Sequence, residues 1–150
     1  MRVGAGEALD DLEHVLEQYH LALGEFMRGN HEPTKLLYSE REDVTLGNPF
    51  GPFARGWTHV VETMERAASH YQDGDATGFD AIARYVSPDL ACFVEVERLR
   101  SKVGGRDDVA PVELRVTTVF RKEDGGWKIV HRHADPITTA QAAESVLHTT

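Results

Sequence analysis

Two histidines and one aspartate stand at alternate positions near the end of the chain. They are His131, His133 and Asp135, and they continue the alternation begun by Trp127 and Ile129. Because alternate residues of a β-strand point to one face, an uninterrupted strand would place all of these side chains together. Imidazoles act as general acids and bases near neutral pH, and a neighbouring carboxylate can fix the tautomer of one ring. The spacing therefore predicts an apolar core beside a proton-transferring pocket.

The same residues allow two other interpretations. One or both histidines could be hydrogen-bonded structural residues at the end of a sheet. His131 and His133 could also present two ligands to one metal ion, but a zinc site needs about three or four protein ligands. The single cysteine, Cys92, is remote in sequence, and no second ligand cluster stands out. We therefore predict no metal site.

Two glutamates share one face of a second predicted strand. Glu95 and Glu97 alternate in phase with Phe93 and Leu99. If that face lines a partly apolar cavity, burial raises the pKa of the carboxyl groups and favours proton transfer. The opposite face of the strand is also half apolar, and an error of one residue in phase reverses the assignment. The sequence leaves open which face points inward.

The other candidate ligand contacts are aromatic or polar residues spread along the chain. They are Tyr19, Tyr38, Asn48, Phe50, Trp57, Arg115 and Thr117. An inward Arg115 could neutralise a glutamate or bind a ligand carboxylate or enolate, and the alternative is a salt bridge at the rim. The aromatic residues could form the wall and mouth of a cavity, although aromatic stripes in helices are usually core. Turn and cap roles are common for asparagines such as Asn48.

Periodicity predicts the elements that would position these residues. Two long amphipathic helices are expected over 8–28 and about 57–71, with a short helix ending at Tyr38 between them. Strands are expected over 43–48, 79–86, 90–100, 112–122 and 127–134. Sequential hairpins with helices on one face of the sheet make an α+β architecture. A strongly curved sheet under helices leaves a cone-shaped space, and such spaces between layers commonly bind small ligands.

Composition narrows the functional classes. The chain has 150 residues, which suits one domain, and its formal net charge of -9 opposes binding to nucleic acid or to an anionic membrane surface. No segment approaches the ~20 apolar residues of a membrane span, and residues 1–11 lack the apolar run of a signal peptide. A lone cysteine suits a reducing compartment. We expect a cytoplasmic protein.

Two segments, together with the element order, resemble a known family. They are Gly-Pro-Phe-Ala-Arg-Gly-Trp before the second long helix and Asp-Gly-Gly-Trp-Lys-Ile-Val-His-Arg-His-Ala-Asp near the end. Over residues 8–136 the chain resembles SnoaL-like proteins of the nuclear transport factor 2-like superfamily, which leaves 137–150 as a C-terminal tail. The resemblance implies a strongly curved antiparallel or mixed sheet around a cone-shaped cavity, two long capping helices, one short helix and frequent homodimerisation. Members include polyketide cyclases, steroid isomerases, dehydratases and non-catalytic modules.

The resemblance also implies roles for particular residues. In related steroid isomerases a tyrosine on the first helix stabilises an oxyanion together with a protonated aspartate. Tyr19 is placed similarly, and Glu95 or Glu97 would have to substitute for the aspartate. In SnoaL-like cyclases the acidic position lies on the final strand, where this chain has His133 or Asp135.

Two functional hypotheses follow. In the first, the protein binds a small hydrophobic carbonyl compound and, if it is an enzyme, is a cofactor-free cyclase, isomerase or dehydratase. His131 or His133 would move the proton, Asp135 would orient the ring, and Arg115 would steady developing negative charge. In the second, the chain is a non-catalytic dimerisation or ligand-sensing module. In both we expect a homodimer through the outer sheet face, with exposed valines among 94, 96 and 116 as contacts.

Overall fold

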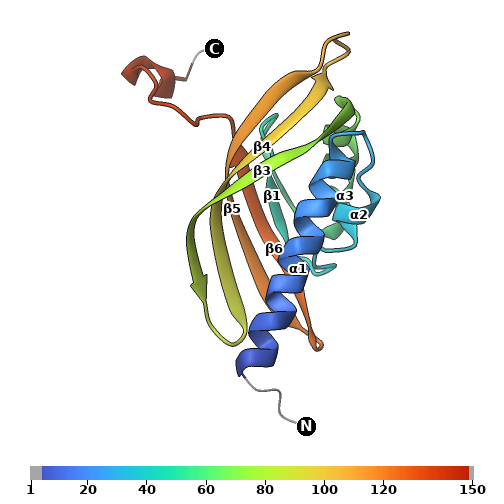
Figure 1. Cartoon of the computed structure of the whole chain (residues 1–150), viewed down its shortest axis with the longest axis vertical. Coiled ribbons are helices and arrows are strands. Elements are labelled where there is room, and N and C mark those ends of the chain that lie inside the picture. Colours follow the sequence, from blue (N-terminus) through green and yellow to red (C-terminus); the bar gives the residue numbers. More distant parts are fainter. Residues whose placement is uncertain (1–4, 149–150) are drawn as a thin grey trace.

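The computed structural model describes residues 5–148, with side-chain environments given for 11–148. A six-stranded sheet forms one layer, and three helices lie together on one side of it (Figure 1). The elements are α1 (Ala5–Phe26), α2 (Glu32–Lys35), β1 (Thr45–Gly47), β2 (Phe53–Arg55), α3 (Trp57–Ala68), β3 (Tyr71–Val86), β4 (Leu90–Val103), β5 (Ala110–Glu123), β6 (Gly126–Asp135) and a 3-10 helix, η1 (Ala143–Val146). The strand order is β2-β1-β6-β5-β4-β3, with β1 parallel to β6 and the other neighbours antiparallel. The predicted α+β fold is confirmed.

The helices form where apolar residues recur at helical spacing. On α1 the buried positions include Leu12, Leu16, Tyr19 and Leu23, which make one continuous stripe facing the sheet. Burying each leucine contributes about 1.5–3 kcal/mol relative to exposure. Helix α3 buries a similar stripe and then ends at Ala68, so that Tyr71, predicted to close the helix, begins β3 instead.

The C-terminal end of α1 is fixed against the edge of β3 and β4. The Ser101 hydroxyl donates to the Met27 carbonyl at 2.8 Å and accepts from the Gln72 N–H at 3.0 Å. Beside it, a Cβ on Gly74 would lie 2.0 Å from the Arg100 carbonyl oxygen and 2.9 Å from that of Met27. Only glycine therefore lets the strand and the helix end approach this closely.

Irregular pairing bends the sheet. Strand β3 changes register against β4 at three places, between residues 72 and 75, 76 and 78, and 81 and 83. Such bulges increase local twist and curvature, and the long strands in Figure 1 curve accordingly. Residues 72–78, between the predicted helix ending near 71 and the strand predicted over 79–86, also belong to this bent strand.

A further bulge changes the phase of β6. Val119 pairs with His131, while the next residue of β5, Phe120, pairs with Ile129. Val130 is thus an extra residue, opposite no partner, and the alternation resets across it. Before the bulge Trp127 and Ile129 face the core, and after it the residues 132 and 134 do.

This bulge makes one sequence prediction wrong. His131, His133 and Asp135 lie on the outer face of the sheet, opposite to Trp127. The physical reason is that a period of two holds only while the ladder is regular. Arg132, which the regular alternation placed outside, points into the core instead.

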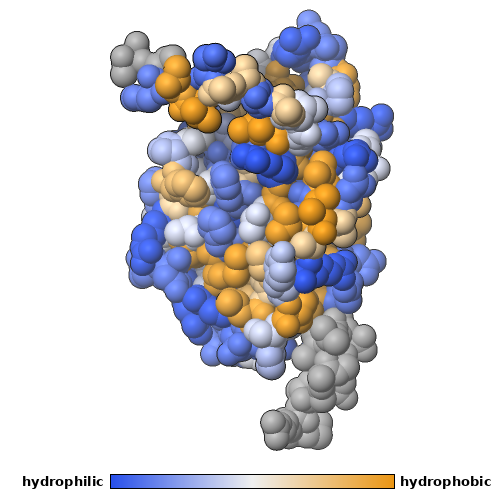
Figure 2. Space-filling view, turned by 90° about the vertical axis from the view of Figure 1, so that its left-hand side faces the viewer, coloured by the Kyte–Doolittle hydropathy of each residue, from blue (hydrophilic) through white to orange (hydrophobic). Residues whose placement is uncertain are grey.

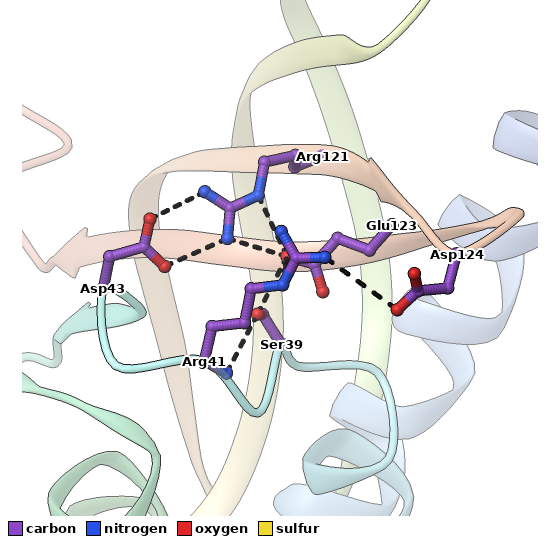
Figure 3. A network of polar contacts seen from close by, with 6 residues as sticks. All are labelled: Ser39, Arg41, Asp43, Arg121, Glu123 and Asp124. Carbon is purple, nitrogen blue, oxygen red and sulfur yellow. Dashed lines mark hydrogen bonds and ion pairs between the residues drawn. The ribbon is translucent and has the colours of Figure 1, made fainter.

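A network of ion pairs fastens the segment after α2 to the β5–β6 hairpin (Figure 3). Arg121 donates from Nη1 and Nη2 to Asp43, at 2.7 and 3.0 Å, and from Nε to Glu123 at 2.9 Å. Glu123 also accepts from the Ser39 hydroxyl at 2.9 Å and lies 3.7 Å from Arg41 Nε. Main-chain hydrogen bonds join the same segment to Ile129. The network therefore fixes the position of Tyr38, which pairs with Ile129 in an isolated bridge.

The remaining differences from the predicted elements are local. Strand β2, which lies between the strand predicted over 43–48 and the helix predicted from about 57, was not expected. It pairs with β1 from Thr45↔Arg55 to Gly47↔Phe53. The end of the chain, as far as residue 148, contains only η1. None of the helices in the described part is both long and apolar enough to cross a bilayer.

Candidate functional site

A buried ion pair between β4 and β6 lies at the centre of the candidate site. Arg132 donates from Nη1 to Glu97 Oε2 at 2.6 Å and from Nη2 to Glu97 Oε1 at 2.9 Å. Glu97 is 0% exposed and Arg132 is 9% exposed. Parallel hydrogen bonds of this kind fix the guanidinium in one orientation. The Arg132 guanidinium is therefore held in one position, and the charge of Glu97 cancels its own.

Tyr19 of α1 completes the polar network. Its hydroxyl accepts a hydrogen bond from Arg132 Nη1 and lies 3.1 Å from the Thr118 hydroxyl and 3.4 Å from Glu97 Oε2. Burial raises the pKa of Tyr19 well above its usual value, although Arg132 acts in the opposite direction. The phenol therefore stays protonated and can both donate and accept. Burial is the largest influence on Arg132 and opposes its charged form, but Glu97, Tyr19 and Tyr38 together outweigh it and raise the pKa of Arg132.

A small cavity adjoins Arg132 between α1, α3 and the sheet. Its volume is about 40 Å³, and its wall is mostly apolar, with Leu23, Met64 and Leu114 among the lining residues. A cavity needs roughly 10–15 Å³ to hold one water molecule. Side chains therefore fill most of the cone-shaped space that the fold predicts, and the remaining hollow suits water or a small chemical group.

Arg132 offers hydrogen-bond donors to this cavity. Its Nη atoms bond to Glu97 and Tyr19, but Nε has no acceptor among the described residues. Because Arg132 lines the cavity, it can donate to a carbonyl or carboxylate oxygen there.

Two lining tyrosines are neutral under ordinary conditions. Tyr38 and Tyr71 are both buried, and burial raises the pKa of each phenol. In both cases Arg132 acts in the opposite direction and Glu97 adds to the increase. The cavity is thus lined by one fixed cation and by phenols that do not ionise near neutral pH.

Of the predicted substrate contacts, three line this cavity. They are Tyr38, Asn48 and Phe50. The Asn48 side chain also accepts a hydrogen bond from the Phe50 N–H at 2.9 Å, so it shapes the turn as well. Trp57 lies elsewhere, in a surface groove with Arg41 and Lys128.

The prediction that Arg115 and Thr117 contact a ligand in the cavity is wrong. Both sit on the outer face of β5, because the inward phase belongs to Leu114, Val116 and Thr118. Arg115 is exposed and donates to Asp135 at 2.7 Å. It cannot neutralise Glu97 or reach the cavity through the sheet.

The outward histidines make ordinary surface contacts. His131 Nδ1 lies 2.8 Å from the Thr45 hydroxyl, and burial together with the charge of His133 lowers the His131 pKa. Burial alone would raise the pKa of Asp135, but hydrogen bonds from Arg115 and from the Ile137 N–H lower it. Asp135 Oδ2 is 3.8 Å from His133 Nε2. These groups therefore lack the cavity that their predicted catalytic roles require.

The structure also shows which face of β4 points inward. Glu95 and Glu97 both point inward with Phe93 and Leu99. Only Glu97 reaches Arg132, since Glu95 pairs with His20 of α1 at 2.8 Å. Within the described residues, no cluster of three or more His, Cys, Asp or Glu side chains is arranged to hold a metal ion.

Sequence reasoning missed Arg132, Thr118 and His20. His20 follows Tyr19 and could have been paired with Glu95 had the inward face been known. Arg132 carried no such signal, because the bulge that turns it inward depends on pairing with β5.

Residues 12–138 match the family of SnoaL-like domains. The chain belongs to this family. A search of curated protein sequences finds no significant match for this SnoaL-like protein.

Solved structures show the same fold. A proposed dehydratase of the nuclear transport factor 2-like family from Streptomyces avermitilis is 20% identical, with a TM-score of 0.73 and coverage of 91% of this chain and 100% of that one. A ketosteroid isomerase-like protein from Erwinia carotovora atroseptica is 19% identical, with a TM-score of 0.71 and coverage of 89% and 98%. A proposed calcium/calmodulin-dependent protein kinase type II association domain from Thiobacillus denitrificans is 18% identical, with a TM-score of 0.69 and coverage of 84% and 94%. At these identities the likeness establishes the architecture of the SnoaL-like protein alone.

Proposed function

We propose that this SnoaL-like protein binds a small, largely hydrophobic molecule through one carbonyl or carboxylate oxygen at Arg132. The observation that carries the proposal is a buried guanidinium whose Nε donor has no acceptor among the described residues and whose side chain lines the interior cavity. Glu97 holds the group in place and balances its charge, so a neutral carbonyl compound can bind without leaving a lone charge buried.

The rest of the ligand would contact apolar side chains. Leu23, Met64 and Leu114 line the cavity away from Arg132. A molecule larger than the present volume of about 40 Å³ requires a wall to move. The best candidate is the segment at Phe50, which lies outside any helix or strand and has a side chain that is 47% exposed.

The geometry favours binding over catalysis. Acid–base catalysis near neutral pH needs a titratable group within reach of the ligand. The lining groups are Arg132 and neutral tyrosines, while the predicted catalytic histidines lie on the opposite face of the sheet. The family likeness to a proposed dehydratase and an isomerase-like protein supports a carbonyl compound as the ligand class. Ligand sensing or carriage is therefore the function that we propose.

A matched double variant tests this proposal. Arg132→Met together with Glu97→Leu removes both charges, so it leaves neither buried alone. We expect cyclohexanone and cyclohexanecarboxylate to stabilise the native protein in thermal unfolding and to lose this effect in the double variant. A ligand at a hundred times its Kd adds about 2.7 kcal/mol of stability. Equal stabilisation of both proteins by these probes would overturn the role of Arg132.

A second proposal concerns assembly. The outer sheet face carries half-buried Val94 and Val96 and the 63% exposed side chain of Phe53. Figure 2 looks at the side of the molecule away from the helices, and apolar patches there alternate with hydrophilic ones. Val116, predicted to share this face, is buried in the core.

We propose that two copies associate through this face, because association would remove these side chains from water. Sedimentation equilibrium at micromolar concentration should give a dimer, and Val96→Lys should shift it toward the monomer. The matched variant Leu36→Lys changes an exposed leucine in the segment next to α2, on the helical side, and should leave the dimer intact. A monomeric unmodified protein would contradict the proposal.

A further inference from the structure

Phe50 lies between the interior cavity and the solvent. Its side chain is 47% exposed, yet it lines the same cavity as Arg132. Among the lining residues it alone is exposed, since Phe26, Asn48 and Pro49 are half-buried and the others are buried. A side chain with one side in water and the other on the cavity separates the two. The cavity is therefore closed from solvent chiefly by Phe50.

The wall away from this segment is held in place. Most lining residues belong to helices or strands. Met27 lies just after α1, and its carbonyl accepts a hydrogen bond from Ser101 at 2.8 Å. Tyr38 also lies outside these elements, and it pairs with Ile129 in the isolated bridge. These parts of the wall cannot move without breaking contacts to the sheet.

The segment 48–51 has fewer attachments. The Phe50 N–H donates to Asn48 Oδ1 at 2.9 Å, and the Gly51 N–H donates to the Asn48 carbonyl at 3.1 Å. Within the described structure these are the hydrogen bonds of Phe50 and Gly51, and both are internal to the segment. A Cβ on Gly51 would meet no atom within 4 Å, so the chain is not packed there. The segment can therefore change conformation without breaking hydrogen bonds to the rest of the protein.

The ring of Phe50 rests on other aromatic rings. Its centroid is 4.8 Å from that of His70 and 5.9 Å from that of Tyr71. Tyr71 lies 6.0 Å from Phe26 in the same measure, and both of these residues line the cavity. If the Phe50 ring turned outward, the place that it leaves would be bordered by Tyr71. Such a place suits a ring of the ligand, because aromatic side chains pack well against other rings.

We propose that Phe50 is the gate of the interior cavity and sets the size of the ligand that it admits, an inference that deepens the function proposed above. With Phe50 in its present position, the hollow of about 40 Å³ suits water or a small group. A ligand with a six-membered ring enters when the Phe50 ring turns outward, and the ring of the ligand then packs against Tyr71. Phe50 thus limits ligand size, whereas Arg132 recognises an oxygen.

Benzene tests the gate without using Arg132. Phe50→Ala removes the ring, and the variant should fold because that ring is already half exposed. In the unmodified protein only the fraction of molecules with an open gate can bind, and this lowers the apparent affinity by that fraction. For a minor open state of about 10% or less, the variant should bind benzene about tenfold more tightly or better. Thermal unfolding measures the affinity, and methyl NMR shifts at Leu23, Met64 and Leu114 locate the probe.

Tyr85→Ala is the matched control for Phe50→Ala. It removes another aromatic ring, 64% exposed, that does not line the cavity. It should bind benzene as the unmodified protein does. Equal benzene affinity in Phe50→Ala and Tyr85→Ala would overturn the gate, and so would methyl shifts outside the cavity.

Cyclohexanone separates this inference from the function proposed for Arg132. Phe50→Ala should bind it more tightly than the unmodified protein does. Adding Arg132→Met and Glu97→Leu to Phe50→Ala should weaken cyclohexanone binding and leave benzene binding intact. If benzene binding improves in Phe50→Ala but cyclohexanone binding does not depend on Arg132, the gate is correct and the role of Arg132 is wrong. If Phe50→Ala binds neither probe, the gate is wrong.

Discussion

Arg132 and Arg121 both pair with carboxylates, but they differ in what surrounds them. Arg121 lies at the end of the sheet, and its Nε, Nη1 and Nη2 atoms all donate to Asp43 or Glu123. Arg132 lies inside, lines a cavity, and bonds through its Nη atoms to one carboxylate and one phenol, while its Nε has no acceptor among the described residues. The first arrangement joins chain segments, because its donors are all engaged by the protein. The second also keeps a donor available, which is what a binding site requires.

Removing Arg132 should have the largest effect. In Arg132→Ala the carboxylate of Glu97 is left buried without its partner, and breaking such pairs costs about 3–5 kcal/mol. Urea unfolding of the variant and of the unmodified protein measures this loss. The Arg132→Met/Glu97→Leu double variant should recover most of the stability, since neither charge remains. If the single variant were as stable as the double one, Glu97 would not depend on Arg132.

Removing Arg121 should have a smaller effect on the same measurement. After Arg121→Ala, Glu123 still accepts from Ser39 and lies near Arg41, while Asp43 returns to solvent. We expect a loss of about 1–2 kcal/mol, between the value of about 0.2–1 kcal/mol for an exposed ion pair and that of about 1.5–3 kcal/mol for a hydrogen bond to a charged group. The variant should leave ligand binding at Arg132 unchanged. A loss equal to that of Arg132→Ala would remove the distinction between the two networks.

The smallest expected effect is a pH dependence of the Arg121 network. Hydrogen bonds from Arg121 lower the pKa of Asp43 in the folded protein, although burial acts weakly the other way. A carboxyl whose folded pKa is depressed stabilises the fold above its unfolded pKa of about 3.9, and this contribution fades as pH falls through the folded pKa. Asp43→Asn should therefore be slightly less stable at pH 6 and equal to the unmodified protein near pH 2.5. Urea unfolding across this range measures it, and a constant difference would contradict the assignment.

Local patterns were sufficient for much of the fold. The apolar stripe through Leu12, Leu16 and Leu23 predicted α1, and the consecutive strands expected over 79–86 and 90–100 predicted the β3–β4 hairpin. Each of these patterns lies within a short stretch of sequence, so residue propensities and the period of the apolar residues are enough to predict the element. Strand β2 was missed because three residues after a proline-rich turn are too few to show an alternation of apolar and polar side chains. The strand forms through pairing with β1.

The candidate site was predicted only in part. Tyr38, Asn48 and Phe50, three of the candidate ligand contacts, line the cavity, and their role in binding remains a prediction. The inward orientation of Glu97 was left open, since both faces of β4 are half apolar. The predicted catalytic face of β6 was wrong, because Val130 is inserted opposite β5 and reverses the orientation of every residue after it.

The sequence by itself determined the α+β class, the two amphipathic helices and the succession of hairpins. Those features depend on the spacing of apolar side chains within one element, which is three or four positions in a helix and two in a strand. Only the tertiary structure decided that Arg132 lies in the core beside Glu97, that His131 and His133 lie outside, and that His20 of α1 contacts Glu95 of β4. The reason is that a bulge and the facing of strands are set by pairing and packing between segments far apart in the chain, where an extra residue changes the phase without altering local composition.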